Sequence, residues 1–221
     1  SRVSSEVLRN TQTYFLNMFH LLGSNDDVIK QDLATHGLSL FDHFDIKYVT
    51  IHKEILSYDK INQNTLSLEF LPETKQHMSE ILGGDKPIYE DNHIIVYKIP
   101  KSNSLEPFLL LGSGWYIFEV LENARATMKS SEIMIVNPTN SEMNVTLNLV
   151  LTSIKNENVV TVFMNNEKLT SYDIPTKLTY TQIENLTLKP GINTVVLEND
   201  KFAEYGKTKV SLKVESISIT N

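Results

Sequence analysis

From about residue 104 onward, the sequence is a succession of short segments rich in β-branched and aromatic residues, separated by Asn, Gly, Pro and Ser. In the clearest of them, residues 143–152 (MNVTLNLVLT), every residue on one face is apolar, and every residue on the other face except Val150 is polar. Strict alternation is typical of a strand with one face buried and the other in water. Ten or so such segments, with no helical pattern among them, predict an antiparallel β-sandwich of the jelly-roll or immunoglobulin-like type.

Two turn signals in this half support the same fold. Asn165 and Asn166 stand between two strand patterns and predict a two-residue hairpin, because asparagine tolerates the positive φ angles that such turns require. The segment KPGIN at residues 189–193 predicts a second turn between strands. Neighbouring strands are therefore expected to run antiparallel.

The first hundred residues mix helical and strand patterns. Apolar residues three and four apart predict an amphipathic helix over residues 5–22. A second helix is predicted over residues 26–36, with Ser24 or Asn25 as its N-cap and Gly37 just past its end.

Further along this region, residues 46–51 are rich in β-formers and predict a buried strand. A third helix is expected to begin at Pro72 and to stop at Gly83 and Gly84. Two short strands then follow across a turn at residues 90–92. The order of strand, helix and strand predicts a small α/β domain.

The polar segment KSNSLEP, residues 101–107, interrupts both patterns. We therefore predict an α+β protein of two domains, a small α/β domain over residues 1–103 and a β-sandwich over residues 104–221. A chain of 221 residues is long enough to bury a sizeable core in this arrangement.

Charge, cysteine content and hydropathy exclude several classes of function. The net charge of −7 and the scattered lysines exclude the basic footprint that binds nucleic acid. The absence of cysteine excludes disulfides and thiol chemistry. No apolar run reaches the roughly 20 residues that span a bilayer, and the start has no signal-peptide pattern. Because the chain opens on Ser1 without an initiator methionine, we expect it to be part of something longer.

The sequence offers no catalytic or metal-binding constellation. Ser113 lacks the G-x-S-x-G context of a nucleophile elbow, and the acid pairs lie at an expected helix start or turn, where local backbone donors satisfy them. We therefore predict no enzyme activity for this fragment, no cofactor and no metal. One hypothetical metal site would combine His36, His43, His52, Asp42 and Asp45. The favoured interpretation is that these histidines are ordinary surface and strand-end residues.

Residues 112–125 (GSGWYIFEVLENAR) gather rare residues. They hold the only tryptophan, Trp115, with Tyr116 beside it, Glu119, and Arg125, one of three arginines. An exposed ring with a nearby acid and a bidentate donor would suit a sugar. The favoured alternative is structural, with Trp115 packed between the sheets or the domains and Arg125 paired with Glu119.

Two N-glycosylation sequons occur, at Asn144 and at Asn185. Asn144 falls on the polar face of its predicted strand, so a glycan there could point into solvent. The tripeptide also arises by chance in a chain rich in Asn and Thr, and an unoccupied site is the default expectation.

Five segments in order carry a family resemblance: DIKYVTIHKEI, LGGDKPIYEDNHIIVYKI, GWYIFEVLENARATMKSSEIMIVNP, VTVFMNNEKL and LTLKPGINTVVLEND. Together they resemble the extracytoplasmic C-terminal region of archaeal and bacterial polytopic membrane proteins of the glycosyltransferase type, akin to dolichyl-phosphate-mannose-protein mannosyltransferases. The family's catalytic acids lie upstream of this region, so none is expected here.

The resemblance implies a non-catalytic domain on the extracytoplasmic face of the cell membrane. Its partners would be the membrane-embedded part of the same polypeptide and a glycan or protein acceptor, which it would position, or it would stabilise the assembly. The alternative is a carbohydrate-binding β-sandwich module in its own right, and Trp115, Tyr116, Glu119 and Arg125 are the residues to inspect for either function.

Overall fold

The computed structural model describes residues 28–53, 71–116, 124–205 and 208–220. The predicted helix over residues 5–22 and the carboxylate of Glu119 lie outside the described residues. The described chain divides into two compact units. One comprises residues 28–31 and 107–220, and the other comprises residues 32–53 and 71–106.

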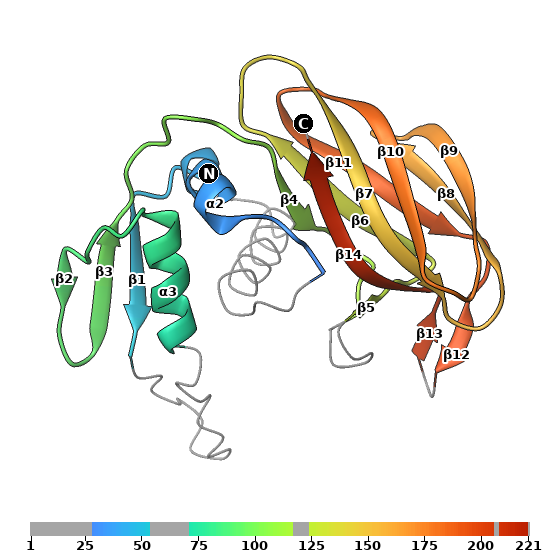
Figure 1. The fold of residues 1–221 in the computed structure, drawn as a ribbon, viewed down its shortest axis with the longest axis horizontal. Coiled ribbons are helices and arrows are strands. Elements are labelled where there is room, and N and C mark those ends of the chain that lie inside the picture. Colours follow the sequence, from blue (N-terminus) through green and yellow to red (C-terminus); the bar gives the residue numbers. More distant parts are fainter. Residues whose placement is uncertain (1–27, 54–70, 117–123, 206–207, 221) are drawn as a thin grey trace, which may run out of the picture. The chain divides into compact units, whose positions relative to one another are not determined.

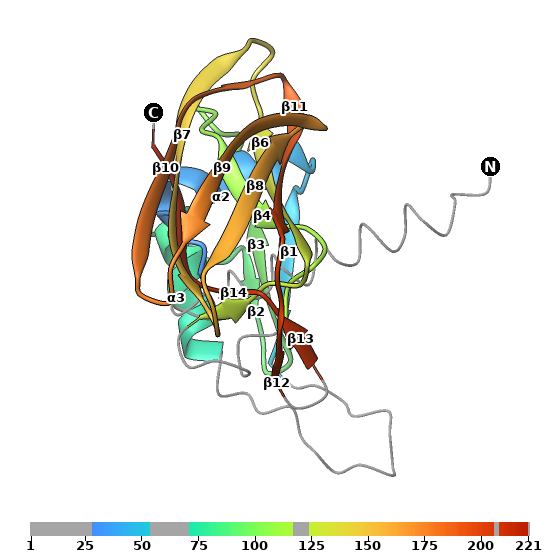
Figure 2. The same cartoon turned by 90° about the vertical axis from the view of Figure 1, so that its right-hand side faces the viewer.

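The larger unit is an antiparallel β-sandwich, which confirms that prediction (Figure 1). One sheet has the order β10–β7–β14–β5 and the other the order β4–β6–β11–β8–β9, and the two form separate layers in Figure 2. A two-stranded ribbon, β12–β13, accompanies them. The strands are β4 (Phe108–Leu111), β5 (Arg125–Ala126), β6 (Ser130–Asn137), β7 (Met143–Ser153), β8 (Asn158–Met164), β9 (Glu167–Ile174), β10 (Thr179–Leu188), β11 (Gly191–Asn199), β12 (Ala203–Tyr205), β13 (Thr208–Val210) and β14 (Leu212–Thr220).

Strand β7 shows why the alternating pattern predicts this fold. Val145, Leu147, Leu149 and Leu151 are each 2% exposed or less, whereas the residues between them are partly exposed. Burying each apolar side chain contributes about 1.5–3 kcal/mol. One face of the strand therefore forms the core of the sandwich, and the other forms an open outer surface.

The predicted hairpin between β8 and β9 is confirmed. Asn165 and Asn166 have φ angles of 49° and 72° and connect Met164 directly to Glu167. Two positive φ angles match a type I′ turn, whose twist suits the flanking strands. The turn before β11 is confirmed as well, since Gly191 adopts a φ of 89° there.

Residues 28–31 join one edge of the sandwich. Ile29 pairs in parallel with Ile217 of β14. The Gln31 side chain reaches the other sheet, where its Oε1 accepts from the Leu109 N–H (3.0 Å) and its Nε2 donates to the Leu109 carbonyl (3.3 Å). The prediction of a helix over residues 26–36 is therefore wrong at residues 28–31, because long-range pairing holds this segment extended.

The smaller unit combines two helices, α2 (Leu33–His43) and α3 (Leu71–Ile81), with an antiparallel sheet of order β1–β3–β2. Its strands are β1 (Tyr48–His52), β2 (Tyr89–Glu90) and β3 (Ile94–Lys98). In Figure 1 these elements carry the blue-to-green colours. The hairpin predicted at residues 90–92 is confirmed as the β2–β3 connection.

Helix α2 begins later than predicted because Asp32, through its Oδ1, caps the Ala34 N–H (3.1 Å). Gly37 does not end the helix. A Cβ at Gly37 would lie 2.6 Å from Cγ1 of Ile81, so the glycine allows α2 and α3 to approach closely. The predicted stop of α3 is confirmed, since Gly83 and Gly84 have φ angles of 62° and 89°.

The hairpin between β2 and β3 is organised by the carboxylate of Asp91. It accepts from the Tyr89 hydroxyl (2.7 Å) and from the backbone N–H groups of Ile94 (2.8 Å) and His93 (2.7 Å). These three donors, with the tyrosine first, lower the pKa of Asp91 from 3.8 to about 2.

We expect the Asp91 carboxyl to titrate near pH 2 in the folded protein, as followed by its carbon chemical shift in NMR. Because the folded pKa lies below the unfolded value, the stabilisation from this group is present above about pH 4 and is lost as the pH falls through 2. Asp91→Asn should remove that pH dependence. A titration midpoint near the ordinary aspartate value would contradict the hydrogen-bonded hairpin.

Candidate ligand-binding site

Trp115 lies in a backbone corner of the sandwich. It pairs with Thr127 in an isolated antiparallel bridge, and its indole N–H donates to the Glu132 carbonyl (2.7 Å). The preceding Gly114 has a φ of 84°, and its carbonyl accepts from the Met128 N–H (2.9 Å). The contacts of the half-buried tryptophan therefore fix the path of the chain.

Tyr116 and Arg125, two further candidate residues for sugar binding, are also engaged within the protein. The Tyr116 hydroxyl donates to the carbonyl of Lys209 on β13 (2.9 Å). Arg125, on β5, is only 8% exposed. The predicted pairing of Arg125 with Glu119 lies outside the described residues, so sugar binding by this group of residues stays a prediction.

A shallow depression lies near these residues, where β7 ends and β8 begins. Its volume is about 10 Å³, which is room for roughly one water molecule or one ligand hydroxyl. The lining residues are mostly polar and come from three separate parts of the chain: Ser153, Lys155, Asn156, Asn158, Lys201, Phe202, Ala203 and Ser211.

Ser211 supplies a buried hydroxyl to this depression. The residue is 2% exposed, and its N–H donates to the Thr127 carbonyl (3.0 Å). Its Oγ has no hydrogen-bond partner in the described part of the chain. Leaving a buried polar group unsatisfied costs about 1–3 kcal/mol, so this hydroxyl is suited to a partner that enters from outside.

An aromatic ring stands beside the same depression. Phe202 is 52% exposed although it is large and apolar. The ammonium group of Lys209 lies 4.6 Å from the centre of the ring, a cation–π contact that helps to hold the ring in place. The depression therefore combines an exposed aromatic surface with hydrogen-bonding groups.

Hydrogen bonds join Asn158 and Lys201 in the wall of the depression. The Asn158 amide donates to the Lys201 carbonyl (3.0 Å) and accepts from the Lys201 N–H (3.2 Å). The Lys201 ammonium donates to the carbonyl of Glu157 (2.9 Å). The side chains of Lys155 and Asn156 are exposed and face solvent at this wall.

Contacts connect the GSGWY corner to the depression. Thr127 pairs with Trp115, and its carbonyl also accepts from the Ser211 N–H. The Tyr116 hydroxyl donates to the Lys209 carbonyl. Two of the candidate sugar-binding residues, Trp115 and Tyr116, therefore contact residues that adjoin the depression instead of lining it. The sequence offered no signal for Phe202 or Ser211, because each stands in an ordinary turn or strand-end segment.

Both sequon asparagines are exposed on the β10–β7 pair. Asn144 lies on the outer face of β7, where its Oδ1 accepts from the Thr187 hydroxyl (2.9 Å). Asn185 has a φ of 57° at a bulge in β10 between Ile183 and Leu186. Glycosylation of either residue stays a prediction.

The histidines drawn together from the sequence do not gather in the structure. Within the ranges that the structure describes, no three His, Cys, Asp or Glu side chains lie close enough to hold a metal ion. His36 and His43 lie on α2, and His52 lies exposed on β1. The helices in the described part of the chain are too short to cross a membrane.

No protein-family model matches the chain, and no curated protein matches it. Solved structures that resemble it include a family 35 carbohydrate binding module from an environmental isolate, with a TM-score of 0.33 and 19% identity, covering 50% of this chain and 74% of that one. A CBM35 from Cellvibrio japonicus Abf62 gives a TM-score of 0.35 and 13% identity over 52% and 94% of the two chains.

The chain also resembles a family two carbohydrate esterase from Clostridium thermocellum, of which it spans only 31%, with a TM-score of 0.33, 12% identity and 51% of this chain covered. With TM-scores below 0.5 and identities below 20%, these likenesses assign neither a family nor a ligand to the chain.

Proposed function

We propose that the β-sandwich unit is a non-catalytic carbohydrate-binding module whose site is the depression beside Phe202. The observation that carries this proposal is the combination of a half-exposed aromatic ring with a buried serine hydroxyl that lacks a partner.

A sugar ring has the matching chemistry. Its C–H groups form an apolar face that can lie on the ring of Phe202, and its hydroxyls both donate and accept hydrogen bonds. One hydroxyl entering the depression would satisfy the Ser211 Oγ. The exposed amide of Asn156 and the ammonium of Lys155 are placed to bind further hydroxyls at the rim.

The lining supports binding rather than catalysis. It includes no carboxylate and no histidine, the groups that most often transfer protons in sugar hydrolysis. Its lysines are exposed or hydrogen-bonded to backbone, as is Lys201. Recognition of a hydroxyl-rich ligand is the chemistry that these side chains can perform.

Ser211→Ala separates a ligand-binding role from a structural one. Since the Ser211 Oγ has no partner, the substitution should leave the free energy of unfolding unchanged or raise it by about 1 kcal/mol. It should weaken the binding of neutral linear hexasaccharides of glucose, xylose or mannose several-fold, as measured by calorimetric titration of the full chain.

Ser153→Ala is the matched control, because the Ser153 hydroxyl already donates to the Asn156 carbonyl within the same depression. It should lower stability, since a bond within the protein is lost. The proposal fails if the wild-type chain binds no sugar of the panel, or if Ser211→Ala destabilises the fold while binding is unaffected.

We propose separately that the chain is part of a longer membrane polypeptide of the glycosyltransferase type, which its sequence resembles. On the extracytoplasmic face of the membrane, a sugar-binding module could hold a glycan acceptor. The reading frame upstream tests it: a run of membrane helices is expected, and a frame without them would refute it.

A further inference from the structure

We infer that the binding site continues from the depression onto the outer face of the β10–β7–β14 sheet, so that the preferred ligand is a linear neutral oligosaccharide rather than a single sugar. This inference rests on the proposed function, and it adds the length and the charge of the ligand.

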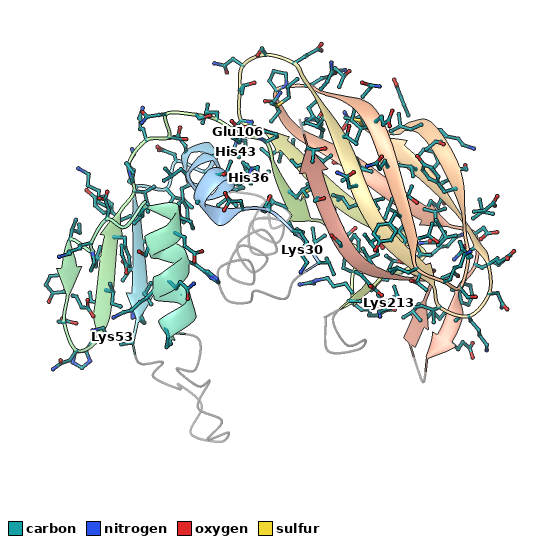
Figure 3. All side chains as sticks on the ribbon, in the orientation of Figure 1. Lys30, His36, His43, Lys53, Glu106 and Lys213 are labelled. Atoms are coloured by element: carbon teal, nitrogen blue, oxygen red, sulfur yellow. The ribbon has the colours of Figure 1, made fainter. Side chains whose placement is uncertain are left out.

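The depression and the outer face adjoin each other along two strands. Ser153 and Ser211 line the depression, and Ser153 pairs with Leu212, the residue after Ser211. The next pair along β7 and β14 is Thr152 with Lys213. In Figure 3, Lys213 lies at the end of the sandwich from which the β12–β13 ribbon projects. The depression therefore lies at the end of the β7–β14 pair, one residue along each strand from the Thr152–Lys213 pair.

An exposed tyrosine, Tyr180, lies on the outer face of the sheet beyond the Thr152–Lys213 pair. Tyr180 of β10 is 76% exposed and pairs with Val150 of β7. Val150 is three residues from Ser153, which is about 10 Å along a strand. Leu178, two residues before Tyr180, is 42% exposed. Tyr180 thus offers a second aromatic surface at a distance that only a ligand longer than one sugar can bridge.

The next row of the sheet carries amides and a hydroxyl. Gln182 pairs with Asn148, which in turn pairs with Ser218, and the Gln182 Nε2 donates to the Asn148 Oδ1 (2.8 Å). This row lies about 7 Å beyond the Tyr180 row. Each amide keeps unused donor and acceptor capacity, because each has two donor hydrogens and two acceptor sites.

The charge on this face indicates a neutral ligand. The Tyr180–Val150–Ser216 row and the Gln182–Asn148–Ser218 row contain no Asp, Glu, His, Lys or Arg. The ammonium of Lys213 nearby pairs with the Glu215 carboxylate (3.0 Å). These two rows offer amides and hydroxyls but no excess of positive charge that would attract an acidic polymer. They therefore favour uncharged sugars that bear hydroxyl groups.

Binding as a function of ligand length tests this inference. Di-, tetra- and hexasaccharides of glucose, xylose and mannose are titrated into the full chain by calorimetry. The wild type should bind the hexasaccharide of its preferred series at least tenfold more tightly than the disaccharide. Tyr180→Ala should abolish that gain while leaving disaccharide affinity unchanged.

Tyr48→Ala is the matched control, because Tyr48 is similarly exposed (58%) on a strand of the smaller unit. It should leave every affinity unchanged. Equal affinity for the disaccharide and the hexasaccharide, or a hexasaccharide gain that survives Tyr180→Ala, would overturn the extended site and leave the proposed function intact. Absence of binding by any probe would instead overturn the proposed function, and the extension with it.

Discussion

Gly114→Ala is expected to destabilise the sandwich by roughly 3 kcal/mol, from the combined cost of a left-handed backbone and of an overpacked contact. Gly114 has a φ of 84°, and a Cβ there would lie 2.0 Å from the Ser130 carbonyl oxygen and 2.8 Å from the Cα of Ser131. Both neighbours are backbone atoms of the β6 region, so neither can rotate away. The corner that holds Trp115 against β6 must therefore shift.

Urea unfolding of the purified chain measures this effect, with Gly191→Ala as the control. Gly191 has a similar φ of 89°, but nothing lies within 4 Å of a Cβ built there. It should cost only about 1–2 kcal/mol, the price of the backbone conformation alone. Equal losses for the two variants would show that the close approach at Gly114 contributes nothing.

Phe202→Ala is expected to lower carbohydrate affinity at least tenfold, about 1.4 kcal/mol, while the chain stays folded. The ring is half exposed, so its removal takes little apolar surface from the core. What is lost is the aromatic surface on which the C–H face of a sugar would lie, together with the cation–π contact to Lys209.

Phe202→Tyr is the matched control, because it keeps both the ring and the position of the lysine. It should bind sugar as the wild type does, and both variants should have a thermal midpoint close to that of the wild type. If Phe202→Ala binds as tightly as Phe202→Tyr, the ring is not the sugar-binding surface.

The sandwich and its hairpins were predictable because their signals are local. The alternation in β7 shows which face is buried, and Asn165 with Asn166 fixes the turn between β8 and β9. These features depend on residues that are neighbours in sequence. The fold class could be predicted without knowing which strands pair or in which register.

The edge of the sandwich was not predictable in this way. Residues 28–31 carry a pattern that also fits a helix, and their extended path depends on Leu109 and Ile217, which are far away in the sequence. Gly37 likewise has the appearance of a helix stop, and only the packing of Ile81 shows that it permits a helix contact. Tertiary contacts overrode local propensity in both places.

The candidate site was hidden for the same reason. Its residues come from the β7–β8 connection and the strand ends beside it, from residues 201–203 after β11, and from Ser211 just before β14. None of these stretches has a recognisable motif. The rare residues at 112–125 drew attention instead. Two of them, Trp115 and Tyr116, contact Thr127 and Lys209 but do not line the depression. The sequence therefore drew attention to residues near the candidate site and not to the residues that line it.

Chemical-shift mapping tests the carbohydrate site most directly. The tightest-binding hexasaccharide is titrated into the ¹⁵N-labelled chain, and the backbone amide signals are followed. Binding at the proposed site predicts the largest shifts at residues 153–158, 201–203 and 209–211, with smaller ones around Tyr180 and Gln182. Saturable binding whose shifts lie elsewhere, with these residues unmoved, would contradict it.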